Sequence, residues 1–513
     1  MSKTASAAAT LALAGAAAGQ GADAESAPNI LLILSDDHTT QTVGCYERRL
    51  SDDAPTPHID RLAQEGMMFE NCFCTNSICV PSRATILTGQ YSHVHGLRGL
   101  KKGFPPSADN VAKQLRQAGY QTMLAGKWHL KNRPSGFDQY QVLRNQGDYF
   151  DPTFRVSGRD WDAEGVVKRG YSTDVITDIT MDMIRQRDND QPFMAICSYK
   201  APHDPYHNHP RNDKLYAGRT IPEPEDLHWD ESPKGRVHDG WPLEGRLKRK
   251  YLKKPERYPK PPLKLDGEDP DKDRAKLYQK FIKDYLRTVA GIDENVGRLM
   301  RFLDEQNLSE NTVVIYTADQ GYFLGEHNLF DKRYMYDEAI RMPLVVRHPK
   351  LVKPGGRSRA IVINADFAPT LLDLANAPIP ESMQGRSLRP LLAGETPADW
   401  RQSMYYHYWD HHWTRRPSHY GVRTHRYKLI YFYGLLREGR EPGECWELYD
   451  LEKDPRERVN RYGDPGYNQI TANLKEQLNE LRKQYGDTDD PLPFRGFSCP
   501  FDVQRRLKRQ GSY

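Results

Sequence analysis

Short apolar segments that each end at polar side chains constrain this chain most strongly. Residues 29–34 read Asn-Ile-Leu-Leu-Ile-Leu and stop at Ser35. Runs without alternating polar positions are typical of strands buried on both faces of a parallel sheet. The same arrangement recurs at residues 121–124, 192–196 and 312–316. These strands predict an α/β protein with one large, mostly parallel central sheet.

Helical periodicity separates the predicted strands. Apolar side chains recur every three or four residues from Leu277 to Leu303, which predicts a long amphipathic helix. A shorter helix is predicted around Val111 and Leu115, and Gly119 suits the left-handed turn that follows a helix. Alternating strands and helices predict helices on both faces of the sheet.

Three segments depart from this alternation. Residues 1–26 are rich in Ala and Gly, and we expect a secretory signal peptide, hence a secreted or periplasmic protein, or else a disordered tail. Residues 206–270 lack a period, and we expect an insertion whose basic residues form a solvated loop or contact an anionic polymer. Residues 393–513 predict a small C-terminal α+β subdomain with an antiparallel sheet, after a main domain at residues 27–392.

Charge and cysteine content exclude several classes of protein. The 73 basic and 69 acidic residues nearly cancel, so there is no global basic field of the kind that binds nucleic acid. Seven cysteines in 513 residues do not make a disulfide framework. Cys72, Cys74 and Cys79 are close in sequence, but no matching histidine cluster completes a tetrahedral zinc site. No apolar run is long enough to form a transmembrane helix.

Oxygen-bearing side chains follow two of the predicted strands. Asp36 and Asp37 come after the first strand, and Asp319 and Gln320 come after the last. Open α/β sheets place their sites beyond the carboxyl ends of the strands, so we expect these side chains to meet. Three carboxylates and one amide suit Ca²⁺ or Mg²⁺ better than Zn²⁺ or copper. A single Asp after a strand could equally cap a helix.

Basic side chains complete the candidate set, and three of them, Lys127, His129 and His203, follow other predicted strands. The candidates are Arg83, Lys127, His129, His203 and Lys332. A metal cation and several basic groups in one place describe a pocket for a tetrahedral oxyanion, either sulfate or phosphate. Each histidine alone could be a hydrogen-bonded core residue, so the prediction depends on the whole set.

One short motif makes the chemistry specific. Residues 79–83 read Cys-Val-Pro-Ser-Arg and are followed by Ala-Thr-Ile-Leu-Thr-Gly. This string resembles the Cys-x-Pro-Ser-Arg signature of type I sulfatases. Further motifs occur in the order of that family, at residues 35–37, 126–129, 201–203, 317–321 and 325–327. The resemblance covers nearly the whole chain after Pro28 and implies an alkaline-phosphatase-like α/β sandwich, in agreement with the predicted sheet.

The resemblance implies two cofactors. In that family the signature cysteine is oxidised to formylglycine by a formylglycine-generating enzyme or maturase, which implies this modification at Cys79. It also implies a bound Ca²⁺, with Mg²⁺ as the alternative. The implied ligands are Asp36, Asp37, Asp319, Gln320 and the modified residue 79. Many members carry Asn or His where Gln320 stands, and Gln keeps the amide oxygen with a longer reach.

The resemblance also implies roles for the basic residues. Arg83 and Lys127 would stabilise the hydroxyls of hydrated formylglycine, and His129 would accept a proton from one of them. His203 and Lys332 would hold the sulfate and protonate the leaving alcohol. Which of these two is the acid stays open.

Weaker motifs indicate the substrate. Residues 75–79, 198–203, 330–336 and 405–408 resemble bacterial glycan sulfatases similar to N-acetylglucosamine-6-sulfatases. The implied reaction removes sulfate from a sulfated carbohydrate, such as O6 of N-acetylglucosamine in a glycosaminoglycan or other glycan. The alternatives are another sulfate position such as iduronate-2-sulfate, a phosphate or phosphonate monoester hydrolase of the same superfamily, and an inactive glycan-binding relative.

A His- and Arg-rich segment after residue 409 provides candidates for sugar contacts. They are Asp410, His411, Arg415, Arg416 and His419. Such side chains could bind sugar hydroxyls beside the sulfate pocket, and a variable surface turn has the same composition.

Overall fold

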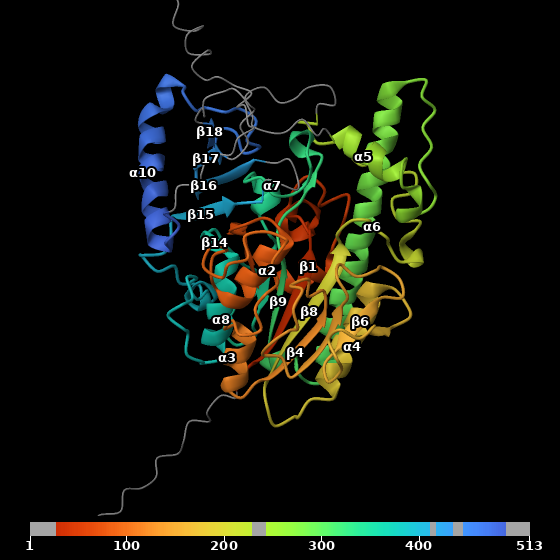
Figure 1. The fold of residues 1–513 in the computed structure, drawn as a ribbon, viewed down its shortest axis with the longest axis vertical. Coiled ribbons are helices and arrows are strands. Elements are labelled where there is room, and N and C mark those ends of the chain that lie inside the picture. Colours follow the sequence, from red (N-terminus) through yellow and green to blue (C-terminus); the bar gives the residue numbers. More distant parts are fainter. Residues whose placement is uncertain (1–26, 228–242, 411–416, 434–444, 489–513) are drawn as a thin grey trace, which may run out of the picture.

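The computed structural model describes residues 27–227, 243–410, 417–433 and 445–488. A ten-stranded sheet runs through its centre (Figure 1). In spatial order its strands are β13 (Gly356–Ser358), β2 (Met67–Phe69), β12 (Leu344–Arg347), β9 (Thr312–Ala318), β1 (Asn29–Asp36), β8 (Phe193–Pro202), β4 (Gln121–Gly126), β5 (Gln139–Leu143), β6 (Thr153–Val156) and β7 (Val166–Val167). The four strands expected from apolar runs are its parallel middle, which confirms the predicted α/β class.

Strand β1 shows why these runs fold as they do. Successive side chains of a strand point to opposite faces of the sheet. Ile30 and Leu32 therefore pack into one apolar cluster, while Leu31 and Ile33 pack into another. All four are at most 1% exposed. Full burial of such a side chain stabilises the fold by about 1.5–3 kcal/mol, and only an uninterrupted apolar run allows it on both faces.

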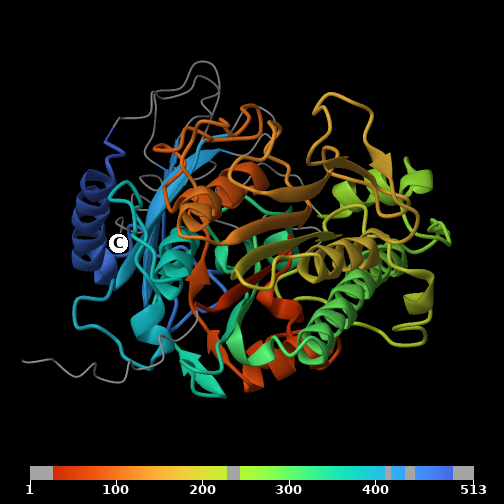
Figure 2. The ribbon, with the colours of Figure 1, turned by 90° about the horizontal axis from the view of Figure 1, so that it is seen from below.

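Helices cover both faces of the sheet, as Figure 2 shows from below. The helices on one face are α2 (Cys79–Thr88), α3 (Val111–Gln117) and α8 (Phe367–Leu374), and those on the other are α1 (Pro57–Gln64), α4 (Ser172–Arg185) and α6 (Pro270–Glu305). Helix α6 is the long helix predicted from periodicity. It starts where the Asp269 side chain accepts hydrogen bonds from the backbone N–H groups of Asp271 and Lys272.

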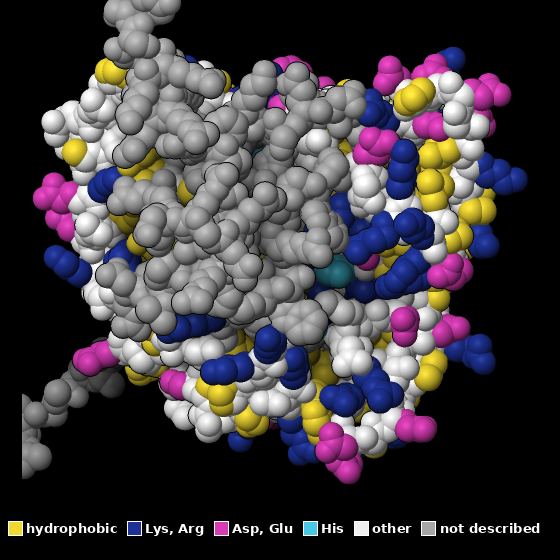
Figure 3. Space-filling view, turned by 45° about the horizontal axis from the view of Figure 1, so that its top comes forward, with side chains coloured by type: hydrophobic (Ala, Val, Ile, Leu, Met, Phe, Trp, Pro, Cys, Tyr) yellow, Lys and Arg dark blue, Asp and Glu magenta, His cyan; other side chains and the backbone are white. Residues whose placement is uncertain are grey.

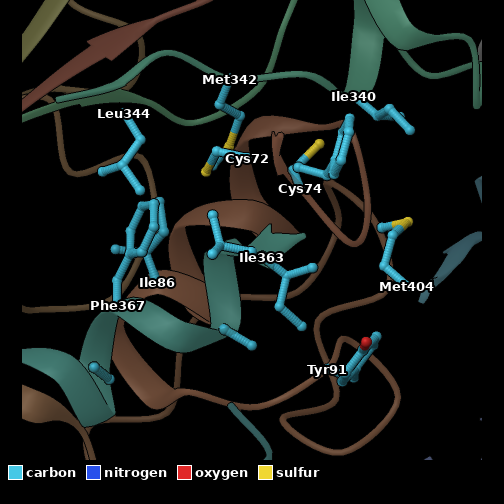
Figure 4. Packing of buried hydrophobic residues seen from close by; sticks show 14 of the residues in the cluster. Cys72, Cys74, Ile86, Tyr91, Ile340, Met342, Leu344, Ile363, Phe367 and Met404 are labelled. Atoms are coloured by element: carbon cyan, nitrogen blue, oxygen red, sulfur yellow. The ribbon is translucent and has the colours of Figure 1, made fainter. Parts of the chain in front are cut away.

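Cys72 and Cys74 are part of the apolar core. Cys72 lies in β3 (Cys72–Phe73), which pairs with β14 (Val362–Ile363). Figure 4 shows Cys72 and Cys74 among Met342 and other apolar side chains. Both are fully buried, and burial raises the pKa of each thiol well above its usual value. They behave as small apolar residues.

The predicted insertion is more regular than its sequence indicated. Residues 243–251 form helix α5 (Leu243–Tyr251), which packs on α6 through Leu243, Leu247 and Tyr251. These three apolar residues recur at intervals of four among charged neighbours. Residues 243–251 are therefore a helix and not the solvated loop that was one of the two expectations. The helix fixes its basic residues in place instead of leaving them on a free loop.

The C-terminal region contains the predicted antiparallel sheet. Its elements are β15 (Ser403–Tyr408), β16 (Ser418–Thr424), β17 (Tyr427–Tyr433), β18 (Cys445–Asp450) and the final helix α10 (Asn468–Tyr485). One apolar cluster includes residues before and after position 392. The domain boundary there stays a prediction, because this sheet shares its core with the main body.

Further short strands and α-helices lie between the larger elements. They are β10 (Phe323–Leu324), β11 (Phe330–Asp331), α7 (Asp337–Ile340) and α9 (Arg389–Leu392). Helix α7 contacts the C-terminal sheet, since Asp337 accepts hydrogen bonds from Arg423 at 3.0 Å and from Lys428 at 2.7 Å. Within the described ranges no helix combines the length and apolarity needed to cross a bilayer.

Candidate active site

The sheet brings the predicted residues to one edge. The residues at or just after the ends of the four middle strands are, in order along that edge, Asp319, Asp36 with Asp37, His203 and Lys127. The strand register keeps these ends level, because Ser35 lies opposite Ala318 and Gly126 lies opposite Ser198. Strand pairing alone therefore assembles most of the site, as expected for a parallel sheet.

Three carboxylates form its centre. Ligand oxygens of Asp36, Asp37 and Asp319 lie within 4.8 Å of one another, and the three residues are at most 1% exposed. The backbone of Asp37 has a φ of 68°, and its N–H donates to Asp319 Oδ1 at 3.1 Å. The Tyr285 hydroxyl donates to the Asp37 carbonyl at 2.7 Å. Carboxylates this close repel one another unless cations compensate their charge.

Each of the three carboxylates has a basic side chain as its nearest ion-pair partner. Lys127 forms an ion pair with Asp36. Lys332, which follows β11, donates to both oxygens of Asp37 at 2.5 Å. Arg83 Nε lies 2.9 Å from Asp319 Oδ2.

The charges do not fully compensate for burial. Burial raises the pKa of Asp319 to about 7, Asp36 adds to this effect, and Arg83 opposes it. Burial likewise raises the pKa of Asp37 to about 6 against the opposing effect of Lys332. For Asp36, the attraction of Lys127 and other cations outweighs burial, and its pKa is well below the usual value. The cluster would therefore be stabilised by further positive charge.

Cys79 is the first residue of α2 and lies against this cluster. Its Sγ is 3.5 Å from Asp36 Oδ1, and Gln320 Nε2 is 3.7 Å from the same sulfur. Arg83 stands four residues later on the same helix face. Burial raises the pKa of the Cys79 thiol to about 12, with Lys332 opposing. Since the thiolate is the nucleophilic form of cysteine, the encoded side chain is not an activated nucleophile.

Gln320 tests whether the residues fit a metal ion. Its Nε2 lies 2.5 Å from Asp37 Oδ1, while its Oε1 is buried without a hydrogen-bond partner in the described part of the chain. Amide oxygen and nitrogen have nearly the same shape, so a half-turn of the amide presents Oε1 to the carboxylates. That turn is favourable only with a cation between the oxygens. Three carboxylates and this amide fit a hard divalent cation such as Ca²⁺.

The two predicted histidines lie at the rim of the cluster. His203 Nδ1 donates to the Asp204 carbonyl at 2.8 Å, so its Nε2 faces Asp37 Oδ2 at 3.7 Å. His129 Nδ1 is buried and has no hydrogen-bond partner among the described residues. Burial and then Lys127 lower the pKa of His129 well below its usual value. The ring is therefore neutral, and a ring nitrogen keeps a lone pair that can accept a hydrogen bond.

Gly126 is required for the approach of Lys127 to the cluster. Its φ is +97°, and a Cβ at this position would collide with the Ser198 carbonyl oxygen on the neighbouring strand. We expect Gly126→Ala to lower the free energy of unfolding by about 3 kcal/mol or more, because strain and a backbone clash add together. The measurement is denaturant unfolding.

The matched control is Gly158→Ala. Gly158 has a φ of +80° with no atom near the added Cβ. The free energy of unfolding of this variant should fall by only about 1–2 kcal/mol, the cost of a left-handed backbone for alanine. An equal loss in both variants would contradict the proposed clash.

The C-terminal sheet supports the segment that leads into α2, a role that the sequence analysis missed. Ser77 Oγ lies 2.7 Å from the Tyr406 hydroxyl, which also donates to the Arg333 carbonyl at 2.5 Å. Tyr406 on β15 thus contacts Ser77, two residues before Cys79, and Arg333, the residue after Lys332. Only the tertiary structure reveals this contact, because it joins positions more than 300 residues apart.

A cleft of about 840 Å³ opens beside His203 and was also missed. Its lining includes Arg144, Tyr149, Phe150, Lys200 and Arg257. Figure 3 shows Lys and Arg side chains gathered around a histidine in a hollow of this face. The cleft is a second region beside the carboxylate cluster, and its volume is larger than a sulfate ion would fill.

The predicted sugar-contact residues have mixed outcomes. His411, Arg415 and Arg416 lie outside the described residues. Asp410 is half-buried near Gly99, where an added Cβ would approach its carboxylate at 3.0 Å.

The prediction for His419 is wrong. Its side chain is fully buried, its Nδ1 donates to the Pro417 carbonyl at 2.9 Å, and its ring stacks between Tyr334 and Tyr406. His419 is therefore a packing residue of the C-terminal sheet. The sequence around His419 did not reveal that aromatic rings enclose this side chain.

Comparison with known proteins agrees with this geometry. A family model described as Sulfatase matches residues 28–377, and a model described as N-sulphoglucosamine sulphohydrolase, C-terminal, matches residues 325–484. An N-acetylglucosamine-6-O-sulfatase from Bacteroides thetaiotaomicron is 39% identical over 504 residues, which cover 90% of this chain and 87% of that protein.

Solved structures share the same fold. One, a protein in complex with its substrate D-glucosamine-2-N,6-O-disulfate, is 38% identical with a TM-score of 0.81, covering 90% of this chain and 99% of that one. A phosphonate monoester hydrolase from Silicibacter pomeroyi is 26% identical with a TM-score of 0.70, covering 90% of this chain and 96% of that one.

Proposed function

Because the chain belongs to the sulfatase family and is a sulfuric ester hydrolase, we propose that it removes the 6-O-sulfate from glucosamine residues of sulfated glycans. The observation that carries the proposal is the position of Cys79. It contacts Asp36 and Gln320 at the centre of the oxygen cluster, with three basic side chains around it. The relative named for N-acetylglucosamine-6-O-sulfatase activity supports the choice of sugar and position.

The proposal includes the modification of Cys79 to formylglycine by a maturation enzyme. A hydrated aldehyde supplies two hydroxyls, one to attack sulfur and one whose deprotonation later expels sulfate. A thiol carries no hydroxyl that could expel sulfate in this way, and burial raises the pKa of the Cys79 thiol to about 12, which favours its neutral form. The buried position of the sulfur makes an unmodified role as nucleophile unfavourable.

A Ca²⁺ ion is part of the same proposal. Asp36, Asp37, Asp319 and Gln320 would hold it together with residue 79. When bound, such an ion polarises a sulfate oxygen and favours an ionised hydroxyl. The raised pKa values of Asp37 and Asp319 and the unpartnered Gln320 Oε1 support this assignment.

The remaining residues then have distinct tasks. Arg83 and Lys127 lie beside residue 79 and would orient its hydroxyls by charge-assisted hydrogen bonds. His129, neutral and unpartnered at Nδ1, would accept the proton of the second hydroxyl. His203 Nε2 and Lys332 Nζ both face Asp37, so both reach the region where sulfate and leaving oxygen would lie. The geometry supports either one as the acid.

The proposal also includes export of the protein from the cytoplasm. The Ala-rich residues 1–26 support a secreted or periplasmic location, where polymeric glycans are accessible. Phosphonate monoester hydrolysis is the second candidate, and the solved relative from Silicibacter pomeroyi is the observation in its favour.

A screen of the matured protein tests the proposal. We expect kcat/KM for N-acetylglucosamine-6-sulfate to exceed that for the 3-sulfate, the 4-sulfated galactosamine and iduronate-2-sulfate by about 100-fold. A pocket whose polar groups hydrogen-bond one sulfated sugar leaves some of these buried groups without partners when another sugar is bound. Sulfate release measured by ion chromatography is the readout.

Aryl sulfate and phenyl phosphonate monoesters serve as the control pair in the same screen. A preference for the phosphonate, or for a sulfate at another position, would contradict the proposed substrate.

A further inference from the structure

The cleft beside His203 contains a lysine whose position the proposed reaction does not explain. Lys200 lies on β8 and is 3% exposed. Alternation along the strand places it on the same face as Ser198, which accepts a hydrogen bond from Arg83 at 2.8 Å. Tyr199 and Ala201 face the opposite core. Lys200 therefore extends from the catalytic face into the cleft.

Lys200 has no ion-pair partner in the part of the chain that the structure describes. Its Nζ contacts the face of Tyr149, 5.1 Å from the ring centre, and no carboxylate of those residues lies within 4.0 Å. The nearby Asp204 is already bound by Lys250 at 2.6 Å and by the Tyr258 hydroxyl at 2.9 Å. A buried ammonium without a carboxylate is costly unless it serves an anion that comes from outside.

Other cations and rings line the same cleft. The guanidinium groups of Arg144 and Arg257 are exposed there, again without an ion pair among the described residues, and Asp148 is the one lining carboxylate without a lysine partner. Phe150 is 43% exposed beside them. Aromatic faces next to cations suit a sugar ring that carries an acidic group better than a free inorganic anion.

We propose that this cleft binds a second anionic group of the glycan and that Lys200 is its specificity-determining contact. The inference rests on the proposed sulfatase reaction and names the class of substrate, a sugar or oligosaccharide with at least two acidic groups. The second group can be an N-sulfate on the same glucosamine or the carboxylate of a neighbouring uronic acid. Both present oxygens to an ammonium, and separate substrates distinguish them.

The experiment compares three sugars on one set of variants. They are N-acetylglucosamine-6-sulfate, glucosamine-2-N,6-O-disulfate, and a disaccharide of 6-sulfated N-acetylglucosamine with a uronic acid. Binding is measured by calorimetry in the Cys79→Ala protein, and kcat/KM is measured in the matured enzyme. Lys200→Met keeps the length of the side chain and removes its charge, and Lys200→Arg restores the charge. Lys353→Met, at an exposed lysine of the loop before β13, is the control.

We expect Lys200→Met to lower the preference for a dianionic over the monoanionic sugar by about tenfold, both in binding and in kcat/KM. Lys200→Arg should recover part of it, and Lys353→Met should leave it unchanged. If Lys200→Met lowers the preference for only one of the two dianionic sugars, the second acidic group of that sugar is the one that the cleft binds. If Lys200→Met does not fold, Arg144→Gln must lower the same preference.

Two results separate the failure of this inference from failure of the proposed function. Unchanged preferences in both Lys200→Met and Arg144→Gln, or a wild-type preference for the monoanionic sugar, would overturn the role of the cleft while turnover persists. Matured protein that binds the dianionic sugars through Lys200 but releases no sulfate would refute the proposed reaction and support the cleft.

Discussion

Cys79→Ala is expected to lower kcat/KM for a sulfate ester by about 10⁴–10⁶-fold, the range seen when a covalent nucleophile is removed. Stability should change little, by about 1 kcal/mol, because only one small side-chain atom is lost and its contacts to Asp36 and Gln320 are long. Turnover of an aryl sulfate and the midpoint of thermal unfolding are the measurements.

Cys197→Ala is the matched control. Cys197 is also fully buried, but it lies on β8 in the apolar cluster on the face of the sheet away from Cys79. We expect Cys197→Ala to keep its activity. Its free energy of unfolding should fall by at least as much as that of Cys79→Ala. Activity retained in Cys79→Ala would refute the role of residue 79.

Removal of the proposed Ca²⁺ ion is expected to abolish turnover and to destabilise the fold. Ca²⁺ at a thousandfold excess over its Kd should add about 4 kcal/mol to the free energy of unfolding, because it binds only the assembled cluster. The effect should persist in the inactive Cys79→Ala protein, so thermal unfolding reports the ion without turnover. It should be larger at pH 8 than at pH 5, because the pKa values of Asp37 and Asp319 are raised to about 6 and 7. At pH 5 the ion must displace protons from both carboxyls.

Asp319→Asn should remove most of this stabilisation, since it takes one of the three carboxylates from the cluster. Asp178→Asn is the control, because Asp178 pairs with Arg298 at the surface. Ca²⁺ stabilisation that is equal in both variants would place the ion elsewhere.

The sequence was sufficient for the centre of the fold and of the site. The apolar run at residues 29–34 is typical of a strand buried on both faces, and parallel strands bring their carboxyl ends together. Asp36 and Asp319 were therefore expected to meet although 283 positions separate them, and their strands are neighbours in the sheet. The family motif added Arg83 and Lys332, which no strand end would have indicated.

The parts that could not be predicted depend on contacts between distant elements. Helix α5 is set by three apolar residues that pack on α6, a surface not visible in the local sequence. His419 was chosen for its polarity, yet Tyr334 and Tyr406 enclose it. Lys200 stands among the residues of strand β8, and only the neighbouring loop of Tyr149 shows that its ammonium lines a cleft.

The most direct test of the central claim compares aldehyde content with activity. Mass spectrometry of the peptide containing residue 79 measures the fraction of protein in which the thiol has become formylglycine. Preparations made with and without a maturation enzyme provide a range of this fraction. We predict that sulfate release from N-acetylglucosamine-6-sulfate rises in proportion to the aldehyde fraction and extrapolates to zero for the pure thiol. Full activity in protein that contains only Cys79 would contradict the account.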